Sequence, residues 1–297
     1  ALAVLFADYS RSRLQQWIRE GRVLVDGHKL KPRDKVFGGE QVQLRASFEP
    51  QVPCAPEPIR LDLVYEDEHL LVVNKPAGLV VHPAAGNPDG TLQNELLHHD
   101  PALVDLPRAG IVHRLDKDTT GLMVVAKTVA AHKSLVEALQ AREISREYRA
   151  LVVGKPTAGG TVEAPLGRHP AKRTRMAVVM SGKHAVTHYR IAERFRIHTL
   201  LAVKLETGRT HQIRVHMAHI HYPLVGDHVY GGRLKLPPAA DEHTRAMLQS
   251  FKRQALHAYR QGLQHPATGE PMQWQAEIPQ DMQTLLDCLR QDMQQHG

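Results

Sequence analysis

Two cysteines, Cys54 and Cys288, are the only ones in the 297-residue sequence. Their wide separation excludes a disulfide framework and a paired CxxC metal site. The sequence also lacks the run of roughly 20 apolar residues that a membrane helix needs, and no signal segment opens it. We therefore expect a globular cytoplasmic protein with no membrane partner. Because the sequence starts with alanine inside an apolar segment, we also expect that residues before Ala1 are missing.

The charge balance of the chain is basic. Lysine and arginine outnumber aspartate and glutamate by 38 to 31, which gives a net charge of +7, and the apolar content of 42% is enough for a core. Nucleic acid is therefore the first partner to consider. A solvated basic surface explains the total charge equally well, so the positions of the charges must decide.

A basic segment, residues 8–44, resembles the S4 RNA-binding module. Ser10 is the expected N-cap of a short amphipathic helix, because Leu14, Trp17 and Ile18 follow it with helical spacing. A strand, a tight Asp-Gly turn and further strands come next. The S4 pattern matches Ser10-Arg11-Ser12, Gly21 to Gly27, and Gly39 to Val42. This resemblance implies phosphate contacts, without readout of sequence, from Arg11, Arg13, Arg19 and Arg22.

Composition divides the chain into three parts. Residues 1–45 form the S4-like module, and residues 46–60 contain four prolines and predict an extended linker. Residues 61–297 have short apolar strands without regular strand–helix alternation, which predicts an α+β fold around a mixed, largely antiparallel sheet with flanking helices. We expect strands at 61–74, 111–112, 122–127, 148–153, 174–180, 184–191, 200–206 and 271–276, and helices at 91–98, 129–141 and 280–291.

The stretch HRLDKDTTG, residues 113–121, interrupts two apolar runs of the larger part. Its first aspartate, Asp116, lies between Arg114 and Lys117, and nearby cations favour an ionised carboxylate. A positioned, ionised carboxylate is a nucleophile or a base. A salt-bridged turn with capping threonines is the ordinary alternative.

Three other sites are weaker hypotheses. Residues 121–128 nearly match a P-loop, but Ala126 replaces the second glycine and the intervening residues form an apolar strand. His216 and His219 could share a helix face and bind zinc, but no HExxH motif and no nearby cysteine supports a metal site. Asp116 and Asp118 are too close in sequence for the usual glycosidase pair, which comes from separate elements.

The stretch HRLDKDTTG also resembles the H-R-L-D-x-x-[TS]-[TS]-G signature of the pseudouridine synthases of the large-subunit and transfer RNA class, the A-type family. Other landmarks of that family follow in the same order. They are Asn74-Lys75-Pro76, Arg146-Glu147-Tyr148, Glu206 to His216, Gly226-Asp227, Tyr230-Gly231-Gly232, and Gln254 to Ala258. With the S4-like segment, the chain looks most similar to the family members that act on the large ribosomal subunit.

The resemblance implies an enzyme that converts uridine to pseudouridine without a cofactor or a metal. Asp116 maps to the catalytic aspartate, as a nucleophile at the sugar or as a base at C2′. Arg114 maps to the arginine that fills the space of the flipped base, Tyr148 to the tyrosine that stacks on the uracil, and Arg214 to the arginine that orients the aspartate.

Further RNA contacts are expected outside that set. We expect the segment from 206 to 211 to gather a phosphate at a helix start through Arg209 and His211, and Lys172 and Arg173 to grip the RNA stem. The implied partner of this monomer is large-subunit (23S) rRNA or a preribosomal particle, at the stem-loop known as helix 69. The alternative is a noncatalytic RNA-binding or ribosome-assembly factor with the same fold.

Overall fold

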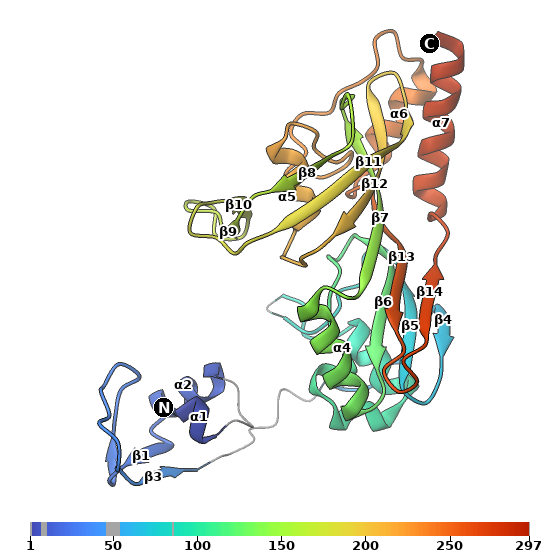
Figure 1. The fold of residues 1–297 in the computed structure, drawn as a ribbon. Coiled ribbons are helices and arrows are strands. Elements are labelled where there is room, and N and C mark those ends of the chain that lie inside the picture. The colour runs from blue at the N-terminus through green and yellow to red at the C-terminus, as the bar shows by residue number, and fades with distance from the viewer. Residues whose placement is uncertain (1, 7–10, 46–53, 85, 297) are drawn as a thin grey trace. The chain divides into compact units, whose positions relative to one another are not determined.

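The computed structural model describes the chain except for residues 1, 7–10, 46–53, 85 and 297. It divides into two compact units, Ala1–Pro53 and Cys54–Gly297 (Figure 1). None of the helices in the described residues is both long and apolar enough to span a membrane.

The first unit contains a helix packed on a small antiparallel sheet. Its sheet has the strand order β2-β1-β3, and Leu14 and Trp17 of the helix form a buried cluster with Val23. The expected tight turn is present, since Asp26 and Gly27 have φ values of 49° and 78°. The predicted N-cap, Ser10, lies outside the described residues. The elements are α1 (Leu2–Leu5), α2 (Arg11–Arg19), β1 (Val23–Val25), β2 (His28–Lys29) and β3 (Val42–Leu44).

The second unit is built on a nine-stranded sheet, as counted over the described residues. The strand order is β4-β5-β6-β13-β7-β12-β11-β8, with β14 paired to β13, and the pairing of β13 with β6 is parallel while the other pairs are antiparallel. The predicted α+β fold with a largely antiparallel sheet is confirmed. The strands are β4 (Leu63–Glu66), β5 (Leu70–Lys75), β6 (Thr120–Ala126), β7 (Ser145–Val153), β8 (Gly160–Glu163), β11 (Val186–Arg194), β12 (His198–Leu205), β13 (Leu256–Gln264) and β14 (Pro271–Gln275).

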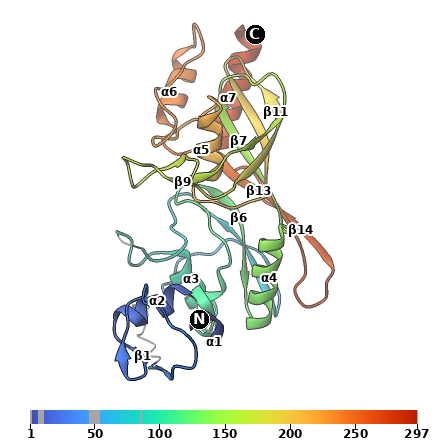
Figure 2. The same ribbon diagram turned by 60° about the vertical axis from the view of Figure 1, so that its left-hand side comes forward.

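Helices cover both faces of this sheet (Figures 1 and 2). Alternate residues of each strand point to opposite faces, so Tyr148 and Ala150 of β7 join one core cluster with α3 and α5, whereas Leu151 joins another with α6 and α7. The helices are α3 (Leu92–His99), α4 (Val129–Ala141), α5 (Gln212–His219), α6 (Glu242–Ser250) and α7 (Gln280–His296), with 3-10 turns η1 (Pro101–Asp105) and η2 (Pro107–Gly110).

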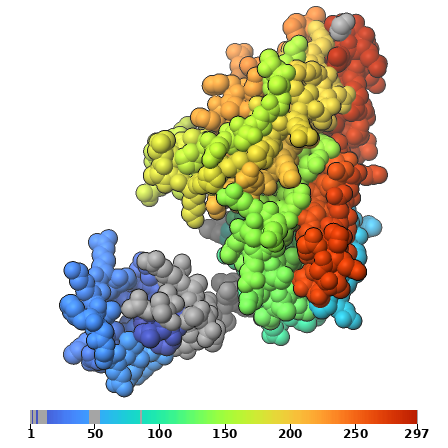
Figure 3. Space-filling view, viewed as in Figure 1, coloured from blue at the N-terminus to red at the C-terminus, as the bar shows by residue number. Residues whose placement is uncertain are grey.

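Two expected strands differ in the structure. Residues 111–112 contribute only an isolated bridge from Ile111 to Val125 after η2, because Gly110 turns the chain with φ of 78°. The expected strand 174–180 is reduced to β10 (Met176–Val178), which pairs with β9 (Leu166–Arg168) in a separate hairpin. The second unit carries this hairpin as a projection (Figure 3).

The Pro-rich segment continues as part of the second unit. Residues 46–53 of the predicted linker lie outside the described residues. Beyond them, the Asn94 amide donates to the Ala55 carbonyl at 2.8 Å, and the Glu57 N–H donates to the Asn94 carbonyl at 3.1 Å. Residues after 53 therefore lie along the start of α3.

Gly121, the last residue of HRLDKDTTG, is where β6 meets β13. Its φ is 110°, and a Cβ built there would lie 2.2 Å from the Ala258 carbonyl oxygen. Both the backbone angle and the contact therefore exclude a side chain. The parallel pairing of Thr120 and Gly121 with β13 depends on this glycine.

Replacing Gly121 with alanine should lower the free energy of unfolding by about 3 kcal/mol or more, because a steric overlap adds to the strain of positive φ. Gly78→Ala is the matched control, since Gly78 has φ of 84° but nothing within 4 Å of its Cβ position. Urea unfolding should show a loss of only about 1–2 kcal/mol for Gly78→Ala. Equal losses for the two variants would contradict a role for the close approach to Ala258.

Candidate active site

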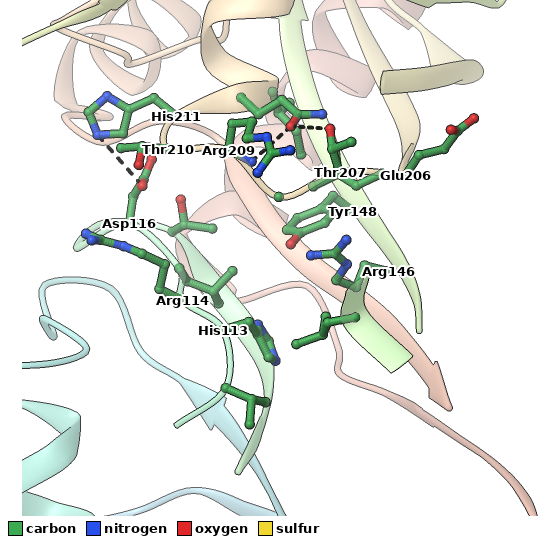
Figure 4. Close-up of a pocket in the computed structure, with 18 of the residues that line it drawn as sticks. His113, Arg114, Asp116, Arg146, Tyr148, Glu206, Thr207, Arg209, Thr210 and His211 are labelled. Atoms are coloured by element: carbon green, nitrogen blue, oxygen red, sulfur yellow. Dashed lines mark hydrogen bonds and ion pairs between the residues drawn. The ribbon is translucent and has the colours of Figure 1, made fainter. Parts of the chain in front are cut away.

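A cavity of about 590 Å³ opens where the loop before β6 meets β7 and the start of α5 (Figure 4). The structure brings six of the predicted site residues to its lining. They are Arg114, Asp116, Tyr148, Arg209, His211 and Arg214. Residues from three distant parts of the sequence therefore meet around one space, whose volume suits a small organic group such as a base.

The other predicted RNA contacts lie elsewhere. Lys172 and Arg173 are exposed in the connection between β9 and β10. Arg19 and Arg22 belong to the first unit, where Arg22 pairs with Glu20 at 2.8 Å. Arg11 and Arg13 are in α2, but their side chains lie outside the described residues.

Asp116 faces two basic side chains across the cavity. Its Oδ2 accepts a hydrogen bond from Arg214 Nη1 at 3.0 Å, and its Oδ1 lies 3.8 Å from His211 Nε2. The Asp116 side chain keeps 16% of its surface exposed. The carboxylate is thus held from one side while one oxygen stays accessible from the cavity.

Arg214 is itself held by a second carboxylate. Asp227 accepts from Arg214 Nε at 2.7 Å and from Nη2 at 2.9 Å, a bidentate pair that fixes the plane of the guanidinium. Burial alone would lower the pKa of Arg214, but the hydrogen bonds and charges of Asp227 and Asp116 raise it. The guanidinium therefore stays charged and directs its remaining Nη1 toward Asp116.

Asp227 is the buried end of this chain of charges. Its side chain is 0% exposed, and Oδ1 also accepts from the N–H groups of Val229 and Tyr230 at 2.9 and 3.0 Å. Burial alone would raise the pKa of Asp227, but Arg214 and these two N–H groups lower it. Asp227 is ionised and has no freedom to turn away from Arg214.

Buried polar contacts fix the loop that carries Asp116. The buried Lys75 donates from Nζ to the Lys117 carbonyl at 2.9 Å, and the Thr119 N–H donates to the Asp116 carbonyl at 3.0 Å. From the other side, the Gln254 amide donates to Thr119 Oγ1 at 3.1 Å. The polar half of HRLDKDTTG is thus a turn fastened to two distant segments.

The start of α5 is fixed by a second buried network. Thr207 Oγ1 donates to Gln212 Oε1 at 2.7 Å, and the Gln212 amide donates to Val186 O at 2.9 Å. The Arg209 N–H also donates to Gln212 Oε1 at 3.0 Å. This N–H group is therefore already satisfied, so a phosphate there would rely on the exposed side chain of Arg209.

His211 precedes α5 in a left-handed conformation with φ of 57°. Its Nδ1 lies 2.8 Å from the hydroxyl of Tyr230, and that hydroxyl accepts from the Met176 N–H at 2.9 Å. Burial, the largest cause, lowers the pKa of His211. A neutral ring that accepts the Tyr230 proton at Nδ1 carries its own proton on Nε2, facing Asp116.

Tyr148 lies on the buried wall of the cavity, whereas Arg114 lies on its exposed rim. Tyr148 is 6% exposed, and burial raises the pKa of its hydroxyl, so its ring is a neutral apolar wall. Arg114 is exposed at the rim of the cavity, two residues before Asp116. The wall suits stacking of a planar ring, and the rim arginine suits contact with what lies outside.

Two of the three weaker hypotheses, the zinc site and the P-loop, do not fit the observed contacts. His216 is buried, with Nδ1 2.9 Å from Thr187 Oγ1 and Nε2 3.0 Å from Ala164 O, so both ring nitrogens are used. Within the described ranges, no group of three His, Cys, Asp or Glu residues could hold a metal ion. Residues 120–126 form the fully buried strand β6, and Lys127 pairs with Glu66 at 2.7 Å. The segment 121–128, which nearly matches a P-loop, is therefore a buried strand and the residues that follow it.

Sequence reasoning assigned no role to several residues of the site. Asp227 and Tyr230 belong to landmarks that the sequence shows, but only their contacts reveal that they hold Arg214 and His211. Arg146 and His113 also line the cavity. The signal for Arg146 was its place two residues before Tyr148, which puts both side chains on one face of a strand.

The Asp227 pair predicts an acid dependence of stability. Because its pKa in the folded state is lowered, Asp227 stabilises the fold above the unfolded-state value of about 4, and that contribution is lost as pH falls through the folded-state pKa. Asp227→Asn should lower the free energy of unfolding by about 3–5 kcal/mol at pH 7. The difference from wild type should shrink below about pH 4.

Urea unfolding at a series of pH values measures this. Asp287→Asn is the control, because Asp287 is exposed on α7 and should change little. A constant difference between Asp227→Asn and wild type at every pH would contradict an ionised Asp227.

Comparison of the chain with known proteins identifies its family. Residues 69–219 match the RNA pseudouridylate synthase family, and residues 1–42 match the S4 domain. The chain is 61% identical over 297 residues, covering 100% of this chain and 91% of the relative, to ribosomal large subunit pseudouridine synthase D of Escherichia coli O6:H1. It is 60% identical over 290 residues, covering 98% and 91%, to the enzyme of the same name from Pseudomonas aeruginosa.

Solved structures agree on the fold. Human RNA pseudouridylate synthase domain containing 4 superposes with a TM-score of 0.60 at 26% identity, covering 77% of this chain and 92% of that one. Human RNA pseudouridylate synthase domain containing 1 has a TM-score of 0.56 at 24% identity, covering 78% and 95%, and supports the fold alone. The prediction from HRLDKDTTG and its landmarks is confirmed: the chain belongs to the RNA pseudouridylate synthase family, with an N-terminal S4 domain.

Proposed function

We propose that this pseudouridine synthase isomerises uridine in large-subunit (23S) rRNA, within the helix 69 stem-loop. The observation that carries the proposal is the accessible carboxylate of Asp116, held by Arg214 at the wall of a base-sized cavity. The names of the relatives, ribosomal large subunit pseudouridine synthase D, support the rRNA substrate. The stem-loop rests on the resemblance in sequence to that group.

The reaction needs no external group. The bond from N1 to C1′ breaks, the uracil turns, C5 bonds to C1′, and the C5 proton is lost while N1 gains one. Asp116 acts either as a nucleophile at C1′ or as a base that removes the C2′ proton. Both roles require the carboxylate at a fixed position, and the hydrogen bond from Arg214 at 3.0 Å supports this requirement.

The target base must leave its stack to reach Asp116. Flipping a nucleotide costs a few kcal/mol, and stacking on an aromatic ring returns about 1–3 kcal/mol. Tyr148 offers that ring inside the cavity, and Arg114 lies at the rim, where its side chain can occupy the space that the base vacates. Exposure of Arg114 and burial of Tyr148 fit these two roles.

Basic side chains of both units bind the rest of the RNA. In the second unit, Lys172 and Arg173 extend on the β9–β10 hairpin, and Arg209 and His211 border the cavity. In the S4 domain, the same task falls to Arg11, Arg13, Arg19 and Arg22. These contacts go to phosphates and give affinity that decreases with salt. We expect the enzyme to act as a monomer.

Removing the Asp116 carboxylate should abolish the reaction. Large-subunit rRNA labelled with tritium at uridine C5 releases tritium when uridine is isomerised. Asp116→Asn should lower the release rate by about 10³-fold or more, because the carboxylate performs the first step. Asp118→Asn is the matched control two residues along the chain and should keep the wild-type rate.

Mapping the pseudouridines in the same RNA locates the target, which we expect in helix 69 alone. Wild type that binds the RNA but releases no tritium would show a noncatalytic RNA-binding factor. Equal release from wild type and Asp116→Asn would show that another residue performs the chemistry.

Arg214→Lys tests whether orientation matters beyond charge. Lysine keeps a positive charge but cannot hold Asp227 with two nitrogens and Asp116 with a third. The single-turnover rate should fall by about 10²-fold, with RNA affinity unchanged. Arg190→Lys, an exposed position on β11, is the control. A wild-type rate for Arg214→Lys would show that charge alone is enough.

A further inference from the structure

Arg146 is a buried cation for which the described residues supply no partner. The residue is only 8% exposed, and its Nε lies buried with no hydrogen-bond acceptor. Within the part of the chain that the structure describes, its side chain makes no hydrogen bond, ion pair or ring contact. Burying an unpaired charge costs free energy. The guanidinium nevertheless lines the cavity beside Tyr148 (Figure 4).

The neighbouring groups do not neutralise Arg146. His113 accepts from the Val124 N–H through Nε2 at 3.1 Å, and burial, with a smaller effect of Arg146, lowers its pKa to about 3, so the ring is neutral. Glu206 is engaged by Arg142 at 2.9 Å and by His188 at 2.6 Å. The positive charge of Arg146 at the inner wall of the cavity is therefore not neutralised by these groups.

Arg146 and Asp116 lie near the same aromatic ring. Arg146 and Tyr148 are two residues apart on β7, so both side chains project from one face of the sheet. After burial, which raises it most, the charge of Arg146 lowers the pKa of the Tyr148 hydroxyl and the charge of Asp116 raises it. A uracil stacked on Tyr148 with N1 toward Asp116 has C4 and its oxygen O4 on the opposite edge of the ring.

We propose that Arg146 binds O4 of the flipped uracil and stabilises the negative charge that the base acquires when it leaves the sugar. When the bond from N1 to C1′ breaks, its electron pair passes to the uracil ring and spreads over N1, O2 and O4. C1′ either gains a bond to Asp116 or forms a double bond to C2′ after Asp116 takes the C2′ proton. Both routes leave the same anion, so the role of Arg146 holds for either, and it rests on the proposed isomerisation.

Depth in the cavity favours the base over a phosphate. Arg114 and Arg209 are exposed around the cavity and suit the RNA backbone, whereas Arg146 is covered by the surrounding side chains. A donor shielded from water stabilises developing charge more effectively than one that faces solvent. An arginine with no other partner can turn its N–H groups to a bound base without breaking a contact.

Gly208 makes room for this guanidinium. A Cβ at Gly208 would lie 2.7 Å from Arg146 Nη1. The backbone of Gly208 has no positive φ, so alanine is sterically allowed apart from that contact. Gly208→Ala therefore shifts the position of the Arg146 guanidinium but does not remove its charge.

The first test compares Arg146→Met with Arg194→Met, an exposed arginine on the nearby strand β11. On a stem-loop RNA that wild type modifies, Arg146→Met should lower the single-turnover rate by about 10²–10³-fold, with unchanged RNA affinity. Gly208→Ala should lose part of that rate, and Arg194→Met none. The thermal midpoint of Arg146→Met should equal or exceed that of wild type, because an uncompensated charge is removed.

The second test changes the base. With 4-thiouridine at the target, sulfur replaces O4 and accepts hydrogen bonds weakly. The ratio of the uridine rate to the 4-thiouridine rate, measured by nucleoside chromatography, should be at least about tenfold larger for wild type than for Arg146→Met. The intrinsic reactivity of the thio base cancels in this comparison because it is the same for both proteins.

Four outcomes would overturn the inference. Equal rate ratios in the two proteins would show that Arg146 does not contact O4. Lower RNA affinity with an intact single-turnover rate would assign Arg146 to a phosphate. A lower thermal midpoint with matching loss of rate would assign it to the fold. Wild type that converts no uridine at all would overturn the proposed function itself, and the contact with O4 with it.

Discussion

The row of three charges from Asp227 through Arg214 to Asp116 is the interaction on which the site depends. The Asp227 carboxylate is fully buried and accepts hydrogen bonds from two backbone N–H groups. It also accepts from Nε and Nη2 of Arg214, and this bidentate pair fixes the Arg214 guanidinium. Arg214 then has one nitrogen left, and that nitrogen fixes Asp116 at 3.0 Å. Because Arg214 is itself held by Asp227, the partly exposed Asp116 carboxylate at the wall of the cavity is held in one orientation.

The fold brings these three residues together from separate parts of the chain. Asp116 comes from a turn before β6, Arg214 from α5, and Asp227 from a loop beyond that helix. Lys75 and Gln254 fasten the turn, Gln212 fastens the start of α5, and the close β6–β13 pairing sets the distance between distant parts of the chain. Buried polar side chains, rather than apolar packing alone, fix the positions of the charged groups at the cavity.

Sequence patterns predicted the fold class and most elements with strong periodicity, such as α4, α7 and β5. They gave no signal for β13, because the buried polar residues His257 and Gln261 interrupt its apolar alternation, or for α6. In the site, the motif located Asp116 and the family resemblance pointed to Arg214. The roles of Asp227 and Arg146 depend on their surroundings and emerged only from the structure. Asp227 binds two N–H groups and a guanidinium, whereas the buried Nε of Arg146 has no acceptor among the described residues.

The central claim is that the target uridine leaves the RNA stack and enters this cavity with its sugar facing Asp116. A crystal structure of the full chain as Asp116→Asn, bound to the helix 69 stem-loop, measures this directly. We expect the uracil on the Tyr148 ring and C1′ within about 3.5 Å of the residue 116 side chain. A target uridine that stays stacked in the stem, with the cavity empty, would contradict it.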